Sequence, residues 1–197
     1  MTKLHVPRAT LLLQPGCEFD HPPDAPELLH PDSPAIEAMT DFREVWPISV
    51  SPEMNIDDAL EHMKRAGVRM LLVVDEDRRI IGIVTAEEFM GELPIKLVEG
   101  ERSGRDAVTV SMVMTPQDKV RVLDMISVKD AQVQHIGETL RELESRHVLV
   151  VDSDPDTGAQ RVRGLFSHSR IQKLLGGNPV QDVPAAHSLA EIVHGSG

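Results

Sequence analysis

Two short stretches of the sequence each place a hydroxyl residue three positions before a charged residue. In GIVTAEEF the pair is Thr85 and Glu88, and in GLFSHSR it is Ser167 and Arg170. A carboxylate can accept two hydrogen bonds from a cis-diol, whereas a guanidinium group only donates. Thr85 and Glu88 also have the spacing of a capping box, in which both side chains bind backbone N–H groups at a helix start. The spacing therefore predicts either diol binding or helix capping at Glu88.

Arg170 changes the chemistry of the second stretch. It has no acceptor atom, so it cannot take the hydroxyl protons that Glu88 can take. Contact with a phosphate and a solvated position on a helix face are the two alternatives, and we favour the solvated position. The second stretch is therefore not expected to bind a nucleoside in the same way as the first.

No catalytic or metal site is expected from the remaining reactive residues. Ser167, His168 and Ser169 are adjacent, but the sequence lacks a nucleophile elbow and an orienting acid at readable spacing. The nine His form no His-x-x-x-His pair, and Cys17 is the single cysteine. We therefore predict neither an enzyme nor a metal protein.

A helix precedes each of these stretches. Before GIVTAEEF, Ile56, Leu60 and Met63 recur at helical spacing. Asn55 is the predicted N-cap of this helix, and Gly67 is its predicted stop. Before GLFSHSR, the apolar residues Ile136, Leu140 and Leu143 recur at a similar spacing and would form one face of a helix. The sequence thus predicts one amphipathic helix in each copy.

Strands follow both helices. VRMLLVVD at 68–75 and RHVLVVD at 146–152 are almost continuously apolar, which is typical of strands buried on both faces. A second strand is predicted at 80–84 and at 162–166, and ISV, at 48–50 and again at 126–128, is taken as the entering strand. Each copy is then a β-α-β-β-α unit, too small to bury its own sheet, so two copies should pack as a pseudo-two-fold α+β pair.

Net charge excludes some partner classes. The chain carries a formal charge of −12, which disfavours broad contact with nucleic acid or with an anionic membrane surface. A small anion can still bind in a local pocket, because net charge does not decide a pocket. The apolar run at 9–13 is too short for a signal peptide or a membrane span, and one cysteine suits a reducing compartment, so we expect a cytoplasmic protein.

The remaining segments give the predicted organisation. Residues 1–34 are rich in Pro and are expected to form an extended arm. The predicted boundaries are 35–95 for repeat 1, 96–109 for a polar linker, 110–176 for repeat 2 and 177–197 for a short tail.

The doubled unit resembles a CBS-domain pair, the Bateman module. The shared signs are MT at the start of each copy, ALEHMKRAGVRMLLVVD, and GIVTAEEF, over roughly residues 38–90 and 110–175. The second copy is more diverged. The resemblance implies a regulatory fold without catalytic residues, with AMP, ADP, ATP or S-adenosylmethionine as ligand, a homodimer built through helices, an unknown effector protein and no required cofactor.

For the first cleft, the resemblance implies a set of four residues. Thr85 and Glu88 would hold the ribose, main chain near Val128 would enter from the other copy, and Arg69 would approach a phosphate. Arg69 is equally well explained as a solvated side chain between two apolar residues.

For the second cleft, the implied residues are Ile48, Ser167, Arg170, Arg146 and His147. Arg146 and His147 precede the buried strand and are candidates for phosphate contact. A His in that position is more often packed and hydrogen-bonded than a ligand-binding group.

Two functions follow from the sequence. The first is a regulatory module that binds an adenosine-containing nucleotide in the first cleft and signals to a partner. The alternative is a dimeric interaction scaffold with no nucleotide bound, which Arg170 and the substitution of Glu88 for the usual aspartate favour.

Overall fold

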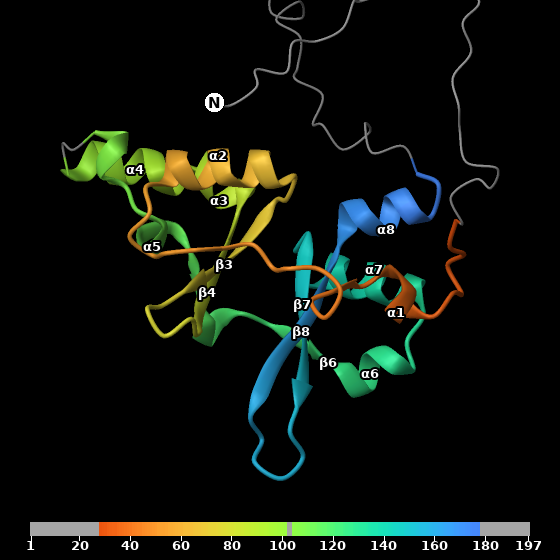
Figure 1. The fold of residues 1–197 in the computed structure, drawn as a ribbon. Coiled ribbons are helices and arrows are strands. Elements are labelled where there is room, and N and C mark those ends of the chain that lie inside the picture. The colour runs from red at the N-terminus through yellow and green to blue at the C-terminus, as the bar shows by residue number, and fades with distance from the viewer. Residues whose placement is uncertain (1–27, 102–103, 178–197) are drawn as a thin grey trace, which may run out of the picture.

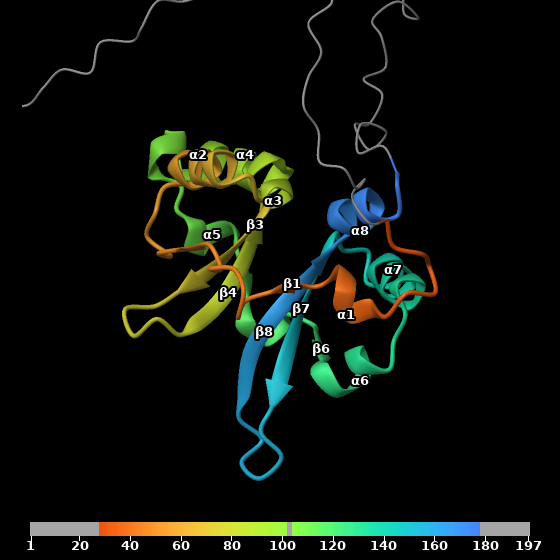
Figure 2. The same cartoon turned by 45° about the vertical axis from the view of Figure 1, so that its right-hand side comes forward.

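The computed structural model describes residues 28–101 and 104–177. Two four-stranded sheets, one in each repeat, have the orders β2-β3-β4-β5 and β1-β8-β7-β6. Figures 1 and 2 show the repeats side by side, with α2, α3 and α4 grouped on the first and α1, α7 and α8 on the second. Most of the predicted N-terminal arm, Cys17 and nearly all of the predicted C-terminal tail lie outside the described residues.

Repeat 1 has the order of elements that the sequence predicts. Asn55 caps the first long helix by accepting a hydrogen bond from the N–H of Asp57, and Gly67 ends it in the left-handed conformation at φ 66°. The elements are β2 (Ser49–Val50), α2 (Ile56–Ala66), β3 (Met70–Val74), β4 (Ile80–Thr85) and α3 (Ala86–Met90).

Repeat 2 repeats this order with one insertion. Its elements are β6 (Val122–Asp124), α6 (Met125–Lys129), α7 (Val133–Glu142), β7 (His147–Ser153), β8 (Gln160–Ser167) and α8 (His168–Leu174). The prediction that ISV at 126–128 forms the entering strand is wrong, because these residues lie in α6. The strand that pairs in parallel with β7 is β6, which lies just before α6.

The lead-in segments are exchanged between the repeats. α1 (Ala35–Ala38) packs on α7, and β1 (Thr40–Asp41) pairs with β8 of repeat 2. In the same way α5 (Val110–Val113) belongs to the core of repeat 1, and β5 (Thr115–Pro116) pairs with β4. Each repeat is therefore completed by chain that precedes the other one.

Two glycines make this exchange possible. A Cβ atom on Gly82 would lie 2.6 Å from the carbonyl oxygen of Thr115, and one on Gly164 would lie 2.4 Å from that of Thr40. These are the glycines that open GIVT and GLFS. The repeated glycine thus permits close approach of the exchanged strand.

The segment between the repeats contains a helix that the sequence did not predict. α4 (Glu92–Glu101) occupies the first part of the expected polar linker, and the 3₁₀ turn η1 (Arg105–Ala107) follows. A second 3₁₀ turn, η2 (Gln117–Lys119), precedes β6.

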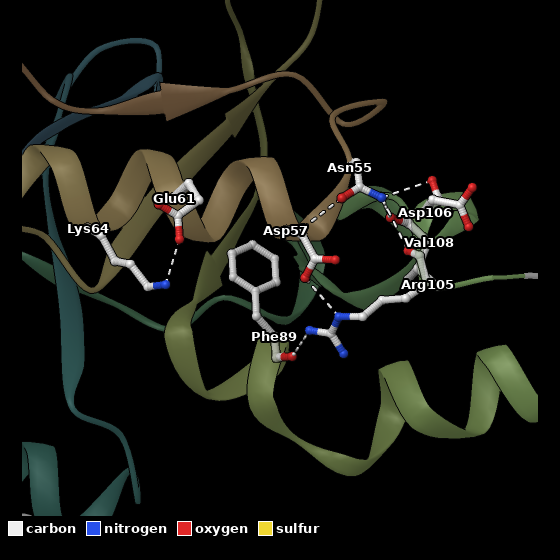
Figure 3. Close-up of polar contacts among 8 residues, drawn as sticks. All are labelled: Asn55, Asp57, Glu61, Lys64, Phe89, Arg105, Asp106 and Val108. Carbon is white, nitrogen blue, oxygen red and sulfur yellow. Dashed lines mark hydrogen bonds and ion pairs between the residues drawn. The ribbon is translucent and has the colours of Figure 1, made fainter.

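A polar network ties the end of this segment to repeat 1 (Figure 3). The side-chain amide of Asn55 donates to the carbonyl oxygens of Arg105, Asp106 and Val108 at 2.9–3.2 Å. Arg105 in turn contacts the Asp57 carboxylate through Nε at 2.8 Å. One residue, Asn55, therefore caps α2 and also anchors the chain that enters repeat 2.

The core has three parts. Within each repeat, alternate residues of the central strand face the helices, such as Leu71 and Val73 of β3. The residues between them, Met70 and Leu72, pack with Leu149 of β7 in a third cluster that joins the two sheets. This confirms that the apolar strands are buried on both faces. No helix within the described residues has the length and apolar composition needed to cross a membrane.

Candidate functional site

A cavity of about 510 Å³ lies between the two repeats. Its walls come from the lead-in to β2, from the end of α2 and the start of β3, and from β8 and α8 of the second repeat. The lining residues are Thr40, Phe42, Val45, Trp46, Pro47, Ile48, Ala66, Gly67, Val68, Arg69, Met70, Leu72, His147, Leu165, Ser167, Ser169, Arg170 and Lys173. Such a volume is in the range of small-molecule sites.

Most residues predicted for the second cleft meet in this cavity. Ile48 lines it together with His147, Ser167 and Arg170, although about a hundred residues of chain separate Ile48 from the other three. Arg69 lines it too, whereas the sequence assigned Arg69 to the first cleft. Arg69 immediately precedes β3, and spacing along the chain does not specify to which side of the strand its side chain turns.

The cavity is locally cationic. Arg69, Arg170 and Lys173 line it, and none of the described lining residues is an Asp or a Glu. Arg170 Nε donates to the carbonyl oxygen of Ala38 at 3.2 Å, which fixes the guanidinium against the end of α1. An anion is therefore the ligand class that the electrostatics of this cavity favour.

His147 is the one lining residue with a strongly shifted pKa. Burial, together with the smaller effects of the Arg146 and Arg69 charges, lowers the pKa of His147 to about 4. The imidazole is thus neutral at pH 7 and presents one donor and one acceptor nitrogen. Because the imidazole is neutral, the positive charge of the cavity comes from Arg69, Arg170 and Lys173.

The first motif has a different local structure. Glu88 Oε2 accepts a hydrogen bond from the backbone N–H of Thr85 at 2.7 Å and also contacts the Thr85 hydroxyl, which completes a capping box at the start of α3. The capping alternative is therefore present in the structure. Neither Thr85 nor Glu88 lines the cavity, and a ribose contact by Glu88 stays a prediction.

Two further predicted residues lie away from the cavity. Arg146 pairs with the Glu87 carboxylate at 2.6 Å, beside the capping box. Val128 is 1% exposed in the core of repeat 2, because α6 turns it inward. The prediction of Val128 for the first cleft rested on the match between the two ISV segments, and strand pairing does not support that match. By strand pairing, the residue of repeat 2 that corresponds to Ile48 is Arg121.

Sequence reasoning missed two residues with useful chemistry. Trp46, the only Trp in the chain, is 87% exposed at the cavity and offers an indole face for stacking. Lys173 follows Arg170 by three residues on α8, so helical spacing was the signal that could have found it. Among the described residues no group of three or more His, Cys, Asp or Glu is placed to hold a metal ion.

Comparison with known sequences identifies the first repeat. The family model of the CBS domain matches residues 47–95. A search of curated proteins found no match.

Solved structures share the fold of both repeats. An uncharacterized conserved protein from Pyrococcus horikoshii is 18% identical, with a TM-score of 0.52 over 74% of this chain and 93% of that one. CBSX2, from Arabidopsis thaliana, solved in complex with AMP, is 20% identical with a TM-score of 0.50, over 72% of this chain and 94% of the other.

A third structure is the CBS-domain pair of protein MJ0100 in complex with 5′-methylthioadenosine and S-adenosyl-L-methionine. It is 20% identical, with a TM-score of 0.50 over 73% of this chain and 100% of that one. The first repeat thus matches the CBS-domain model, and the two repeats together share the fold of a solved CBS-domain pair.

Proposed function

We propose that this protein is a regulatory module that binds an adenosine-containing nucleotide between its two repeats and signals occupancy to a separate effector protein. The observation that carries the proposal is the cavity of about 510 Å³, which the Ile48 segment and Ser167 line from opposite repeats. Two solved pairs with this fold contain adenosine compounds, AMP in one and 5′-methylthioadenosine with S-adenosylmethionine in the other.

The lining offers suitable contacts for each part of such a ligand. Val68, Met70 and Leu165 provide an apolar wall for a base, and the exposed indole of Trp46 provides a stacking surface. Ser169 provides a hydroxyl at the mouth. A mostly apolar pocket with a few polar groups is the usual composition of a small-molecule site.

The signal would arise from a shift in population. A ligand in this cavity contacts both repeats, so it stabilises the arrangement of the repeats that closes best around it. α1 and β1 are next to the cavity, since Arg170 binds the carbonyl oxygen of Ala38 and Thr40 lines the wall. We propose that this lead-in segment transmits occupancy, in a cytoplasmic homodimer, without catalysis by the module itself.

Thermal unfolding against a ligand panel tests the proposal. The panel is AMP, ADP, ATP and S-adenosylmethionine. A ligand at a hundred times its Kd should stabilise the fold by about 2.7 kcal/mol, a rise in Tm of roughly 5–10 °C for a chain of this size. Ser169→Phe, which places a bulky ring at the cavity mouth, should abolish the rise.

The matched control is Ser127→Phe, an exposed position on α6 outside the cavity lining. This variant should keep the full rise in Tm. The absence of a shift with every adenosine compound, in a protein that unfolds normally, would contradict the proposal.

The dimeric scaffold is the second candidate. It is favoured by the first motif, where Glu88 is engaged in the capping box and Glu87 is paired with Arg146 without any ligand. In that case no nucleotide would change Tm, and light scattering would give a dimer mass that does not depend on nucleotide. A monomer with no ligand response would exclude this candidate as well.

A further inference from the structure

The three cationic side chains of the cavity converge from both repeats. Arg69 lies at the start of β3 in repeat 1, whereas Arg170 and Lys173 lie one turn apart on α8 in repeat 2. A negatively charged group between them would contact cations from two sides. This geometry holds an anion at the junction of the repeats, where binding would matter most for their arrangement.

None of these charges is neutralised by a carboxylate in the described part of the chain. The side chains of Arg69 and Lys173 have no hydrogen-bond or ion-pair partner among the described residues, and Arg170 uses only Nε, on the carbonyl oxygen of Ala38. Some cations elsewhere are paired with carboxylates, as in Arg105–Asp57 and Arg146–Glu87. Three such cations around one cavity are unexpected on a chain with a net charge of −12.

We propose that this cavity selects phosphorylated ligands, and that Arg170, with Lys173 and Arg69, binds their phosphate groups. The inference rests on the proposed nucleotide site and adds its specificity. The fixed Nε of Arg170 leaves both terminal Nη atoms to donate in parallel, which is the geometry that suits a phosphate. The same cations repel the positively charged sulfonium of S-adenosylmethionine and gain nothing from an uncharged nucleoside.

His147 adds a second signature of anion binding. The charges of Arg146, which immediately precedes β7, and of Arg69 from repeat 1 both oppose its protonation, and Arg170 and Lys173 line the same cavity. A phosphate placed among these cations would offset their charge and favour the imidazolium form. Binding at mildly acidic pH should therefore be accompanied by proton uptake.

Fluorescence of Trp46 provides the test on the intact chain. It is the only Trp, the chain has no Tyr, and it lines the cavity, so occupancy should change its emission. Titrations would use ATP, ADP, AMP, adenosine, 5′-methylthioadenosine, S-adenosylmethionine and inorganic tripolyphosphate, with calorimetry to confirm each Kd. ATP and ADP should bind at least about tenfold more tightly than adenosine, as expected for hydrogen bonds to charged groups.

Substitutions assign the effect to the cavity. Arg170→Gln and Lys173→Gln should each weaken ATP binding by about tenfold while leaving adenosine binding within about twofold. Arg141→Gln makes the same charge change at an exposed site on α7, outside the cavity lining, and should leave ATP binding unchanged. Circular dichroism of each variant checks that the fold is retained.

The outcomes separate this inference from the function on which it rests. Equal affinity for adenosine, S-adenosylmethionine and ATP, unaffected by Arg170→Gln, would overturn phosphate selection and leave the nucleotide site in place. Binding of tripolyphosphate as tightly as ATP, with no contribution from adenosine, would support phosphate selection and overturn the adenosine ligand. No binding by any compound would overturn both.

Discussion

At the scale of single residues, position in the fold decides what equivalent residues do. Glu88 and Arg170 occupy the same place in the two motifs, three residues after a hydroxyl that caps a helix. Glu88 turns back onto the cap, where its carboxylate meets the Thr85 N–H. Arg170 has no such role, so its guanidinium is held by Ala38 and lines the cavity. The charge of Glu88 thus stays within its own motif, whereas the charge of Arg170 lies at the cavity.

His147 gives the fold a pH dependence that belongs to one residue. The pKa of His147 is about 4 in the folded state, below its ordinary value of 6.5, so between these pH values the unfolded state binds a proton that the folded state does not. The contribution of His147 to stability is therefore lost as pH falls from about 6.5 to 4. The loss should be on the order of 2–3 kcal/mol in the free energy of unfolding.

Urea unfolding of the wild type and of His147→Gln between pH 7.5 and pH 4 measures this loss as a difference between the two proteins. That difference should shift in favour of the variant as pH falls. A constant difference across the range would show that the imidazole titrates normally in the folded state.

At the scale of elements, the exchange of lead-in segments is the feature that makes the two copies depend on each other. β1 completes the sheet of repeat 2 and β5 completes that of repeat 1, each against a strand that carries a glycine at the crossing. The valines of α5 are buried in the first core, and the alanines of α1 are buried in the second. Neither repeat buries its hydrophobic surface with its own chain alone.

Replacement of the crossing glycines should displace the exchanged strands. Gly164→Ala places a Cβ 2.4 Å from the Thr40 carbonyl oxygen, and Gly82→Ala places one 2.6 Å from that of Thr115. Because backbone atoms on both sides must move, each variant should lose about 1–3 kcal/mol of stability. Chemical denaturation measures the loss.

Gly137→Ala is the control for this prediction. Gly137 lies inside α7, where an added Cβ meets no atom within 4 Å, so alanine should stabilise the helix by about 0.5–1 kcal/mol. The same substitution is thus expected to have opposite signs at the two kinds of site. Equal effects at Gly137 and Gly164 would contradict the role given to the crossing.

At the scale of the whole molecule, the two repeats share one interior. Met70 and Leu72 of repeat 1 pack against Leu149 of repeat 2, and partly buried residues such as Phe42 and Val122 surround them. The cavity adjoins this cluster, since Met70 and Leu72 also line its wall. A change in the angle between the repeats would therefore change the cavity.

Shared packing predicts that both repeats unfold in one transition. Leu149→Ala should lower stability by about 2–5 kcal/mol, as for other buried leucines, and a single transition should remain. Scanning calorimetry measures this through the ratio of the van't Hoff and calorimetric enthalpies, which is expected to be near one.

The control is Ile126→Ala, at a position that is 70% exposed. This variant should change stability by less than about 0.5 kcal/mol. Two separate transitions in the wild type would contradict the shared interior.

Local physics explains which features the sequence predicted correctly. Asn55 and Gly67 mark the ends of α2 through hydrogen bonding and backbone conformation that depend only on neighbouring residues. The runs around Leu71 and Leu149 indicate strands buried on both faces through their composition, and the order of motifs, found twice, indicates a paired repeat. The capping box at Glu88 follows from spacing within a single turn.

By itself, then, the sequence determined the long helices α2 and α7, the central strands and the doubled fold, because each depends on residues that are close in the chain. Only the tertiary structure decided the exchange of lead-in strands, the inward turn of Val128 in α6, and the meeting of Arg69, Arg170 and Lys173 at one cavity. These features depend on how distant segments pack. Spacing along the chain does not specify which distant segment a strand start or a helix face will meet.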